Sequence, residues 1–369
     1  MPKTKFYSLS RILKENANYY MIFGERSNGK TYAVEEYCLK DFCENGKQMA
    51  LIRRWSEDFR GKRGQQMFEA LVTNGLVDKY SKGKWNTIYY YSSRWFLARW
   101  DEENDKLIRD ETPFCFAFSL NSNEHDKSTS YPKVYNIFFD EFITRGVYIP
   151  DEFIQFQNVI STIARQRPAE EFKIFMCGNT VNQYCPYFEE MGLTDIRQMK
   201  KDEVQVYQYG ENHARVAVEY ASMPSKSKAS DKLFAFNNPK LKMITEGAWE
   251  IPSYPRLPTK YVKSDICATY FIIFEEDILQ CEIIIKDGQY FTYIHEKTSP
   301  IKNTEEDIVF CKDFSGYPNW RRRLTKPSDD LGRKIYSFFL MEKVFYQSNR
   351  VGEVVRNYLL WSKEDKGFI

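Results

Sequence analysis

An apolar run that leads into a glycine-bearing turn near the start of the chain limits most strongly what this sequence can fold into. Residues 19–23 read Tyr-Tyr-Met-Ile-Phe, and residues 24–31 fill the spacing G-x-x-x-x-G-K-[ST]. In this pattern the glycines allow backbone N–H groups to surround nucleotide phosphates, and the helix that follows adds its own preference for anions. A turn could match the pattern by accident, but the strand-like run before it and the helical spacing after it favour a phosphate-binding loop.

The residues of this loop have expected roles toward ATP and Mg²⁺. Lys30 would reach the β- and γ-phosphates, and the Thr31 hydroxyl would hold Mg²⁺. A helix is predicted from Lys30 to Phe42 and a strand at Met49–Trp55, which together form the first half of a doubly wound parallel sheet. Such sheets bind ligands at the carboxyl ends of their strands. The predicted ATP-binding residues are Gly24, Glu25, Arg26, Ser27, Asn28, Gly29, Lys30, Thr31 and Tyr32.

A second apolar run, Val134–Phe139, ends in two adjacent acids, Asp140 and Glu141. A buried strand here would carry Asp140 to the same sheet edge, where it could complete the coordination of Mg²⁺, and Glu141 would polarise the attacking water. Two acids after a strand could also form an ordinary turn, but their position after a phosphate loop favours the catalytic interpretation. The adjacent glutamate favours ATP hydrolysis by the additional-strand (ASCE) class of P-loop NTPases over nucleotide binding alone.

Two further candidate sites follow these acids. A helix is predicted over Glu152–Ala164, and it ends at Arg165 and Arg167, which we expect near the nucleotide edge. These arginines could include an arginine finger that stabilises charge on the γ-phosphate, or they could only compensate the helix dipole. The next strand, Phe172–Met176, leads to Asn179, a candidate γ-phosphate sensor for which an ordinary Gly-Asn turn is the competing interpretation.

Any contact with a polyanion must come from local groups, because the formal net charge is only +2 over 369 residues. Arg60, Lys62 and Arg63 form a basic, glycine-bracketed loop that could touch a polyanion. The polar stretch at residues 120–130 predicts a flexible loop, in which Lys127 is the only lysine or arginine.

The length and pattern of the chain predict two domains joined by a smaller connecting part. We expect an ATPase domain over residues 1–200, a linker subdomain over 201–262 and an α+β domain over 263–369. The elements predicted in the last domain are strands at Cys267–Phe274, Leu279–Lys286 and Tyr290–Glu296, and helices at Asp330–Gln347 and Gly352–Ser362. A meander followed by helices is compatible with an RNase H-like domain. The first strand has no central acid, so nuclease activity is not expected.

Cysteine usage and hydropathy bear on the compartment of the protein. The eight cysteines form no C-x-x-C pair and only three histidines are present, which argues against a zinc site or a disulfide framework and suits a reducing cytoplasm. No apolar run has membrane-spanning length, and the N-terminus does not read as a secretory leader. We therefore expect a cytoplasmic protein without a membrane partner.

Residues 17–190 resemble the DNA-encapsidation ATPases of phi29-like phages, which are P-loop ATPases of the FtsK/HerA type. The resemblance is carried by six segments. They are Ile-Arg-Arg at 52–54, Phe-Ser-Leu at 118–120 followed by the polar loop with Lys127, Tyr-Pro-Lys-Val at 131–134, Ile-Phe-Phe-Asp-Glu-Phe-Ile at 137–143, Ile-Ala-Arg-Gln-Arg at 163–167, and Gly-Asn-Thr-Val-Asn-Gln-Tyr-Cys-Pro-Tyr-Phe at 178–188. It implies a motor that uses ATP to drive double-stranded DNA into a prohead, as a homopentameric ring docked on the phage portal. It also implies work in the host cytoplasm and transiently at the portal vertex.

The resemblance implies roles for particular residues as well. Arg165 would be an arginine finger that acts in trans, and Arg167 could share this role. Lys127 matches a basic pore-loop position and Asn179 a coupling residue. The C-terminal domain would be a vestigial nuclease that meets the portal or a packaging RNA, in agreement with the missing acid.

Three other functions are alternatives to this one. A helicase-like ATPase would be favoured by stimulation with single-stranded rather than duplex DNA. A terminase with an active nuclease would cut plasmid DNA in the presence of divalent metal. A nucleotide-binding scaffold without turnover is disfavoured by Glu141.

Overall fold

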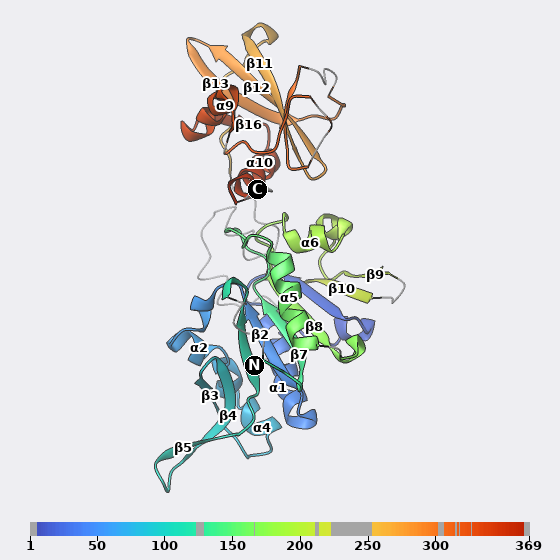
Figure 1. Ribbon diagram of the computed structural model, residues 1–369, viewed down its shortest axis with the longest axis vertical. Helices are drawn as coiled ribbons and strands as arrows, with labels where there is room; N and C mark the ends of the chain where they lie inside the picture. Colours follow the sequence, from blue (N-terminus) through green and yellow to red (C-terminus); the bar gives the residue numbers. More distant parts are fainter. Residues whose placement is uncertain are drawn as a thin grey trace, which may run out of the picture. The chain divides into compact units, whose positions relative to one another are not determined.

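The computed structural model describes residues 6–122, 129–165, 167–210, 214–222, 253–301, 306–313, 316, 318–325 and 327–364. The chain forms two compact units, residues 1–250 and residues 251–369 (Figure 1).

The first unit is built on a ten-stranded sheet with a parallel centre. Through this centre the strand order is β6 (Cys115–Ser119), β2 (Gln48–Arg53), β7 (Val134–Asp140), β8 (Lys173–Asn179), β1 (Tyr19–Gly24) and β10 (Ala214–Ala221). Strand β8 lies between β1, which leads into the phosphate loop, and β7, which ends in the acids. This intervening strand is the one that the predicted additional-strand class requires.

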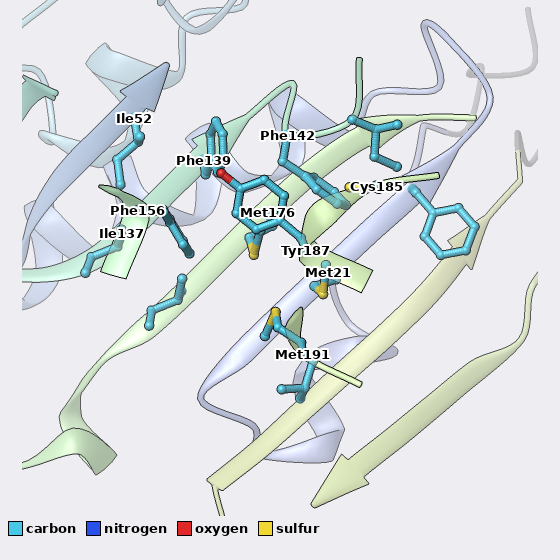
Figure 2. Packing of buried hydrophobic residues seen from close by; sticks show 14 of the residues in the cluster. Met21, Ile52, Ile137, Phe139, Phe142, Phe156, Met176, Cys185, Tyr187 and Met191 are labelled. Carbon is cyan, nitrogen blue, oxygen red and sulfur yellow. The ribbon is translucent and has the colours of Figure 1, made fainter. Parts of the chain in front are cut away.

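Helices cover both faces of the sheet, which explains why its central strands read as continuous apolar runs. Helix α1 (Lys30–Asn45) buries Val34 and Leu39 in the core on one face. Helix α5 (Glu152–Ala164) buries Phe156 in the core on the other face, where Figure 2 shows it beside Phe139. The predicted doubly wound arrangement is therefore confirmed.

Antiparallel strands extend the sheet beyond β6. They are β3 (Thr87–Tyr91), β4 (Arg94–Asp101) and β5 (Lys106–Arg109). The segment before them contains three short helices, α2 (Lys62–Gln66), α3 (Glu69–Thr73) and α4 (Leu76–Tyr80). Strand β6 pairs with β4 in antiparallel orientation and with β2 in parallel orientation.

The strands at the other edge of the sheet, beyond β1, show that the first unit extends past the predicted boundary at residue 200. Strand β10 pairs in parallel with β1, and β9 (Val204–Tyr209) pairs in antiparallel orientation with β10. Both belong to the first sheet, because the apolar run at 216–221 completes the core beside the strand of the phosphate loop. The part of the expected linker subdomain at residues 223–252 lies outside the described residues.

In its described residues, the second unit has a six-stranded sheet and two long helices. Its strands β11 (Ile266–Phe274), β12 (Asp277–Lys286) and β13 (Gln289–Glu296) form the predicted antiparallel meander. Strand β14 (Ile308–Cys311) is parallel to β11 and also pairs with the short β15 (Trp320–Arg321). Helix α10 (Asn349–Glu364) is the last element of the described residues.

One helix of this unit is shorter than the sequence analysis predicts. Helix α9 (Asp330–Leu340) stops seven residues before the predicted end at Gln347. The sequence Val-Phe-Tyr at residues 344–346 has a strong preference for strands, and it forms β16, which pairs in parallel with β13. Within the described residues, none of the helices combines the length and hydrophobicity needed to span a bilayer.

Candidate active site

The loop between β1 and α1 has a backbone that only glycine can supply at two positions. Gly24 has a φ of 149°, and a Cβ atom there would lie 2.0 Å from the carbonyl oxygen of Ala221 in β10. Gly29 has a φ of 92° and immediately precedes α1. These two glycines bring the loop close against β10 and direct the N-terminus of α1 toward the loop, as anion binding requires.

Lys30 places its ammonium group inside this loop and is only 5% exposed. Its Nζ donates to the backbone carbonyl of Glu25, to Oδ1 of Asn28 at 3.1 Å and to Oδ1 of Asn179 at 3.4 Å. Burial lowers the pKa of Lys30 to about 8. A triphosphate in the loop would supply negative charge to this ammonium, and Asn179 lies where it could respond to the same phosphate.

Thr31 and Asp140 meet although 109 positions separate them in the sequence. The Thr31 hydroxyl donates to Oδ1 of Asp140 at 3.0 Å. Burial raises the pKa of Asp140, and the neighbouring guanidinium of Arg53 opposes this shift. A hydroxyl and a carboxylate side by side are the hard oxygen ligands that Mg²⁺ prefers, so the residues of this site fit a magnesium nucleotide.

Glu141 follows β7 in a left-handed backbone conformation, with a φ of 62°. Its side chain is 65% exposed, and Oε2 lies 2.8 Å from Nη1 of Arg53. The same guanidinium donates from Nη2 to Oδ2 of Asp140 at 2.7 Å. Arg53 therefore binds both acids, a role that the sequence analysis did not predict, although its Ile-Arg-Arg segment marks the carboxyl end of β2.

The remaining residues of the predicted nucleotide set lie around the loop. Glu25 is buried and forms an ion pair with Lys201 at 3.0 Å. Arg26 and Ser27 are exposed at the tip of the loop, while Tyr32 is half-buried in the first turn of α1. The N-terminal segment touches this loop as well, because the amide N–H of Tyr7 donates to the carbonyl of Asn28.

The two arginines at the end of α5 do not lie at the nucleotide edge of the sheet, where the sequence predicts them. Helix α5 begins after β7 and returns to the start of that strand, where Nη1 of Arg167 donates to the carbonyl of Pro132 at 3.0 Å. The end of α5 thus lies at the sheet edge opposite the phosphate loop, because a connection between two parallel strands must cross the sheet. Arg165 follows the helix there as its C-cap.

The Arg167 guanidinium is engaged by its own helix end. It donates to the carbonyls of Ala164 at 3.2 Å and Ile163 at 2.6 Å. It also stacks on the rings of Tyr135 and Phe172, with centroid distances of 4.8 and 4.5 Å. These contacts match the alternative interpretation, in which a cation compensates the carboxyl end of a helix.

Four residues are predicted to contact a polyanion. Lys127 is outside the described residues. Arg60, Lys62 and Arg63 are exposed, and Arg60 forms an ion pair with Glu57 at 3.6 Å. Lys62 and Arg63 belong to α2 rather than to a loop.

Comparisons with known proteins agree with this geometry. The family described as podovirus DNA encapsidation protein (Gp16) matches residues 1–208. The DNA packaging protein of Bacillus phage phi29 is 27% identical over 191 residues, which cover 51% of this chain and 50% of that protein. The DNA packaging protein of Bacillus phage B103 is 28% identical over 175 residues, which cover 47% of each chain. The chain spans about half the length of the curated relatives it matches.

Two solved structures share the fold over nearly the whole chain. The Phi-28 gp11 DNA packaging motor is 20% identical with a TM-score of 0.51, and the match covers 98% of this chain and 97% of that one. The bacteriophage Phi-29 viral genome packaging motor assembly is 18% identical with a TM-score of 0.54, covering 95% and 96%. The predicted fold class, a P-loop α/β unit followed by an α+β unit, is confirmed.

Proposed function

Since this chain belongs to the podovirus DNA encapsidation protein (Gp16) family, we propose that it hydrolyses ATP and uses the energy to move double-stranded viral DNA into a prohead. The observation that carries the proposal is the meeting of Lys30, Thr31, Asp140 and Glu141 where β1 and β7 end. Relatives named DNA packaging proteins support the choice of substrate.

The proposed chemistry is in-line attack of water on the γ-phosphate. Lys30 binds the β- and γ-phosphates in place of its present partners, and Thr31 and Asp140 hold Mg²⁺. When bound, Mg²⁺ neutralises charge on the phosphate oxygens. Glu141 orients the water and accepts its proton, which its 65% exposed carboxylate can reach.

We further propose that the chain works as a homopentameric ring in which Arg165 acts on the neighbouring site. The position of Arg165 supports a trans role, since it follows the far end of a 13-residue helix that is about 20 Å long and begins beside its own acids. The contacts of Arg167 within its own chain support a structural role for that residue instead.

The partners in this proposal are double-stranded DNA, the phage portal and, in systems that have one, a packaging RNA. Lys127, Arg60, Lys62 and Arg63 are proposed to contact the DNA backbone, because a packaging motor must accept every sequence and cannot depend on base contacts. The second unit would meet the portal or the RNA without nuclease activity. The protein would work in the host cytoplasm and transiently at the portal vertex.

The proposal is tested by measuring ATP turnover with and without duplex DNA and empty proheads. We expect both additions to stimulate turnover, and the Glu141→Gln variant to lose at least ~10²-fold in turnover while its nucleotide affinity stays unchanged. Unchanged turnover in this variant would show that Glu141 does not activate water. Stronger stimulation by single-stranded DNA would favour a helicase-like ATPase, and metal-dependent plasmid cutting would favour a terminase with an active nuclease.

A further inference from the structure

Arg54 lies directly behind the turn that carries Glu141. It follows the last residue of β2 and is 6% exposed. Its Nη1 donates to the carbonyl oxygen of Glu141 at 3.2 Å, and its Nη2 donates to the carbonyl oxygen of Phe142 at 2.9 Å. Whereas Arg53 binds the carboxylates of this turn, Arg54 binds its backbone.

The other side of the Arg54 guanidinium is held by Glu152, the first residue of α5. Nε and Nη2 lie 2.7 and 2.8 Å from the two carboxylate oxygens, which makes the pair bidentate. The same carboxylate accepts the Tyr187 hydroxyl at 2.9 Å and the amide N–H of Ile149 at 2.8 Å. Because the Glu152 side chain is fully buried, these donors fix it and through it fix the guanidinium.

Aromatic rings keep this ion pair away from water. The guanidinium carbon of Arg54 lies 5.0 Å from the ring centroid of Tyr148 and 5.9 Å from that of Phe139. Figure 2 shows Tyr187 among the buried aromatic residues of the same core. Charge-assisted hydrogen bonds are stronger in such a low-dielectric setting, so the pair forms a rigid support.

The turn at Glu141 needs a support of this kind. Its left-handed φ of 62° is unfavourable for a residue with a Cβ atom. Its side chain is 65% exposed, so the direction of the carboxylate is set by the backbone of the turn and by the ion pair with Arg53 rather than by packing. Two hydrogen bonds from a buried guanidinium to successive carbonyls hold that backbone in place.

We propose that Arg54, anchored by Glu152, is a positioning residue that aims the Glu141 carboxylate at the attacking water. The inference rests on the proposed function, in which Glu141 activates that water. Arg54 touches no reacting atom in this scheme, and its effect on hydrolysis passes entirely through the backbone of the turn.

The test uses the full-length chain with Arg54→Lys, which keeps the buried positive charge beside Glu152 but cannot bridge the carboxylate and both carbonyls. A second variant, Arg54→Gln with Glu152→Gln, removes both charges, so that neither is left buried without a partner. We expect both variants to lose on the order of 10²-fold in kcat, with KM changed less than about threefold, because misplacement of a catalytic group affects the chemical step. Arg350→Lys, in an ion pair with Asp277 in the second unit, is the matched control and should leave kcat unchanged.

Single-turnover hydrolysis then distinguishes misorientation of the Glu141 carboxylate from a nonspecific disturbance of the active site by Arg54→Lys. In a Glu141→Gln background, Arg54→Lys should lower the residual rate by less than about threefold, because its effect acts through the missing carboxylate. An equal loss in both backgrounds would overturn the proposal, as would a rise in KM without a fall in kcat. If Glu141→Gln itself keeps full turnover, the proposed function fails at Glu141 and this inference fails with it.

Discussion

Nucleotide binding by this protein should weaken steeply above pH 8, because the lysine of the phosphate loop is neutral there in the empty site. Burial lowers the pKa of Lys30 to about 8, from an ordinary value of 10.5. Bound phosphates supply negative charge and favour the ammonium form, so binding would restore a pKa near the ordinary value. Nucleotide binding is then linked to uptake of a proton between these two pH values.

The size of the effect follows from the two pKa values of Lys30. Raising the pH from 7 to 9.5 should weaken the affinity for ATP about 30-fold, since nearly every empty site must first take up a proton at pH 9.5. The assay is a titration with a fluorescent ATP analogue across this range. Calorimetry at pH 9 in two buffers of different ionisation enthalpy should show close to one proton taken up per nucleotide bound.

A matched variant distinguishes Lys30 from other titrating groups. Lys30→Arg keeps a positive charge at every pH in the range, so its affinity should be weaker at pH 7 but nearly constant up to pH 9.5. A wild-type affinity that changes less than threefold over the range would refute the reasoning. An equal pH dependence in Lys30→Arg would assign the proton to another group.

The low pKa of Lys30 also affects the stability of the empty protein, and in the opposite direction. Nucleotide affinity should fall as the pH rises, whereas the unfolding free energy should rise. In the absence of nucleotide, the buried ammonium of Lys30 opposes folding below pH 8, where the lysine is charged in both the folded and the unfolded chain. This penalty declines as the pH rises from 8 toward 10.5. Relative to Lys30→Met, wild type should therefore gain about 2 kcal/mol of unfolding free energy between pH 7 and 9.5, as measured by urea denaturation.

Three further substitutions test the rest of the site. Gly24→Ala would place a Cβ atom 2.0 Å from the carbonyl oxygen of Ala221 at a φ of 149°. This substitution should lower the unfolding free energy by about 2–3 kcal/mol and abolish nucleotide binding. Thermal denaturation with and without ATP measures both effects. Asp140→Asn removes a proposed ligand of Mg²⁺, so the affinity for ATP should lose its dependence on Mg²⁺ while the affinity measured in EDTA stays within about threefold. Arg165→Ala should lower hydrolysis by about 10³-fold and leave nucleotide binding unchanged. Mixtures of this variant with wild type should lose activity non-linearly with the variant fraction. A loss proportional to the variant fraction would contradict action in trans.

Sequence patterns over short distances predicted which segments form the candidate site. The loop from Gly24 to Thr31 spans eight consecutive residues, and the acids Asp140 and Glu141 follow a continuous apolar run. Such local patterns report backbone conformation and burial, which are set by neighbouring residues. They were therefore sufficient to predict the phosphate loop, the central strands and the meander of the second unit.

The sequence also predicted that Asp140 reaches the sheet edge of Thr31, and the two residues are in contact across 109 positions. Only the tertiary structure decided that β10 lies beside β1, because strand order depends on contacts between distant segments. It also gave the adjacent residues Arg53 and Arg54 different partners. The guanidinium of Arg53 contacts the acids, and that of Arg54 contacts Glu152 and the backbone. Arg53 is the last residue of β2 and Arg54 follows the strand, so two identical residues in the sequence received different partners.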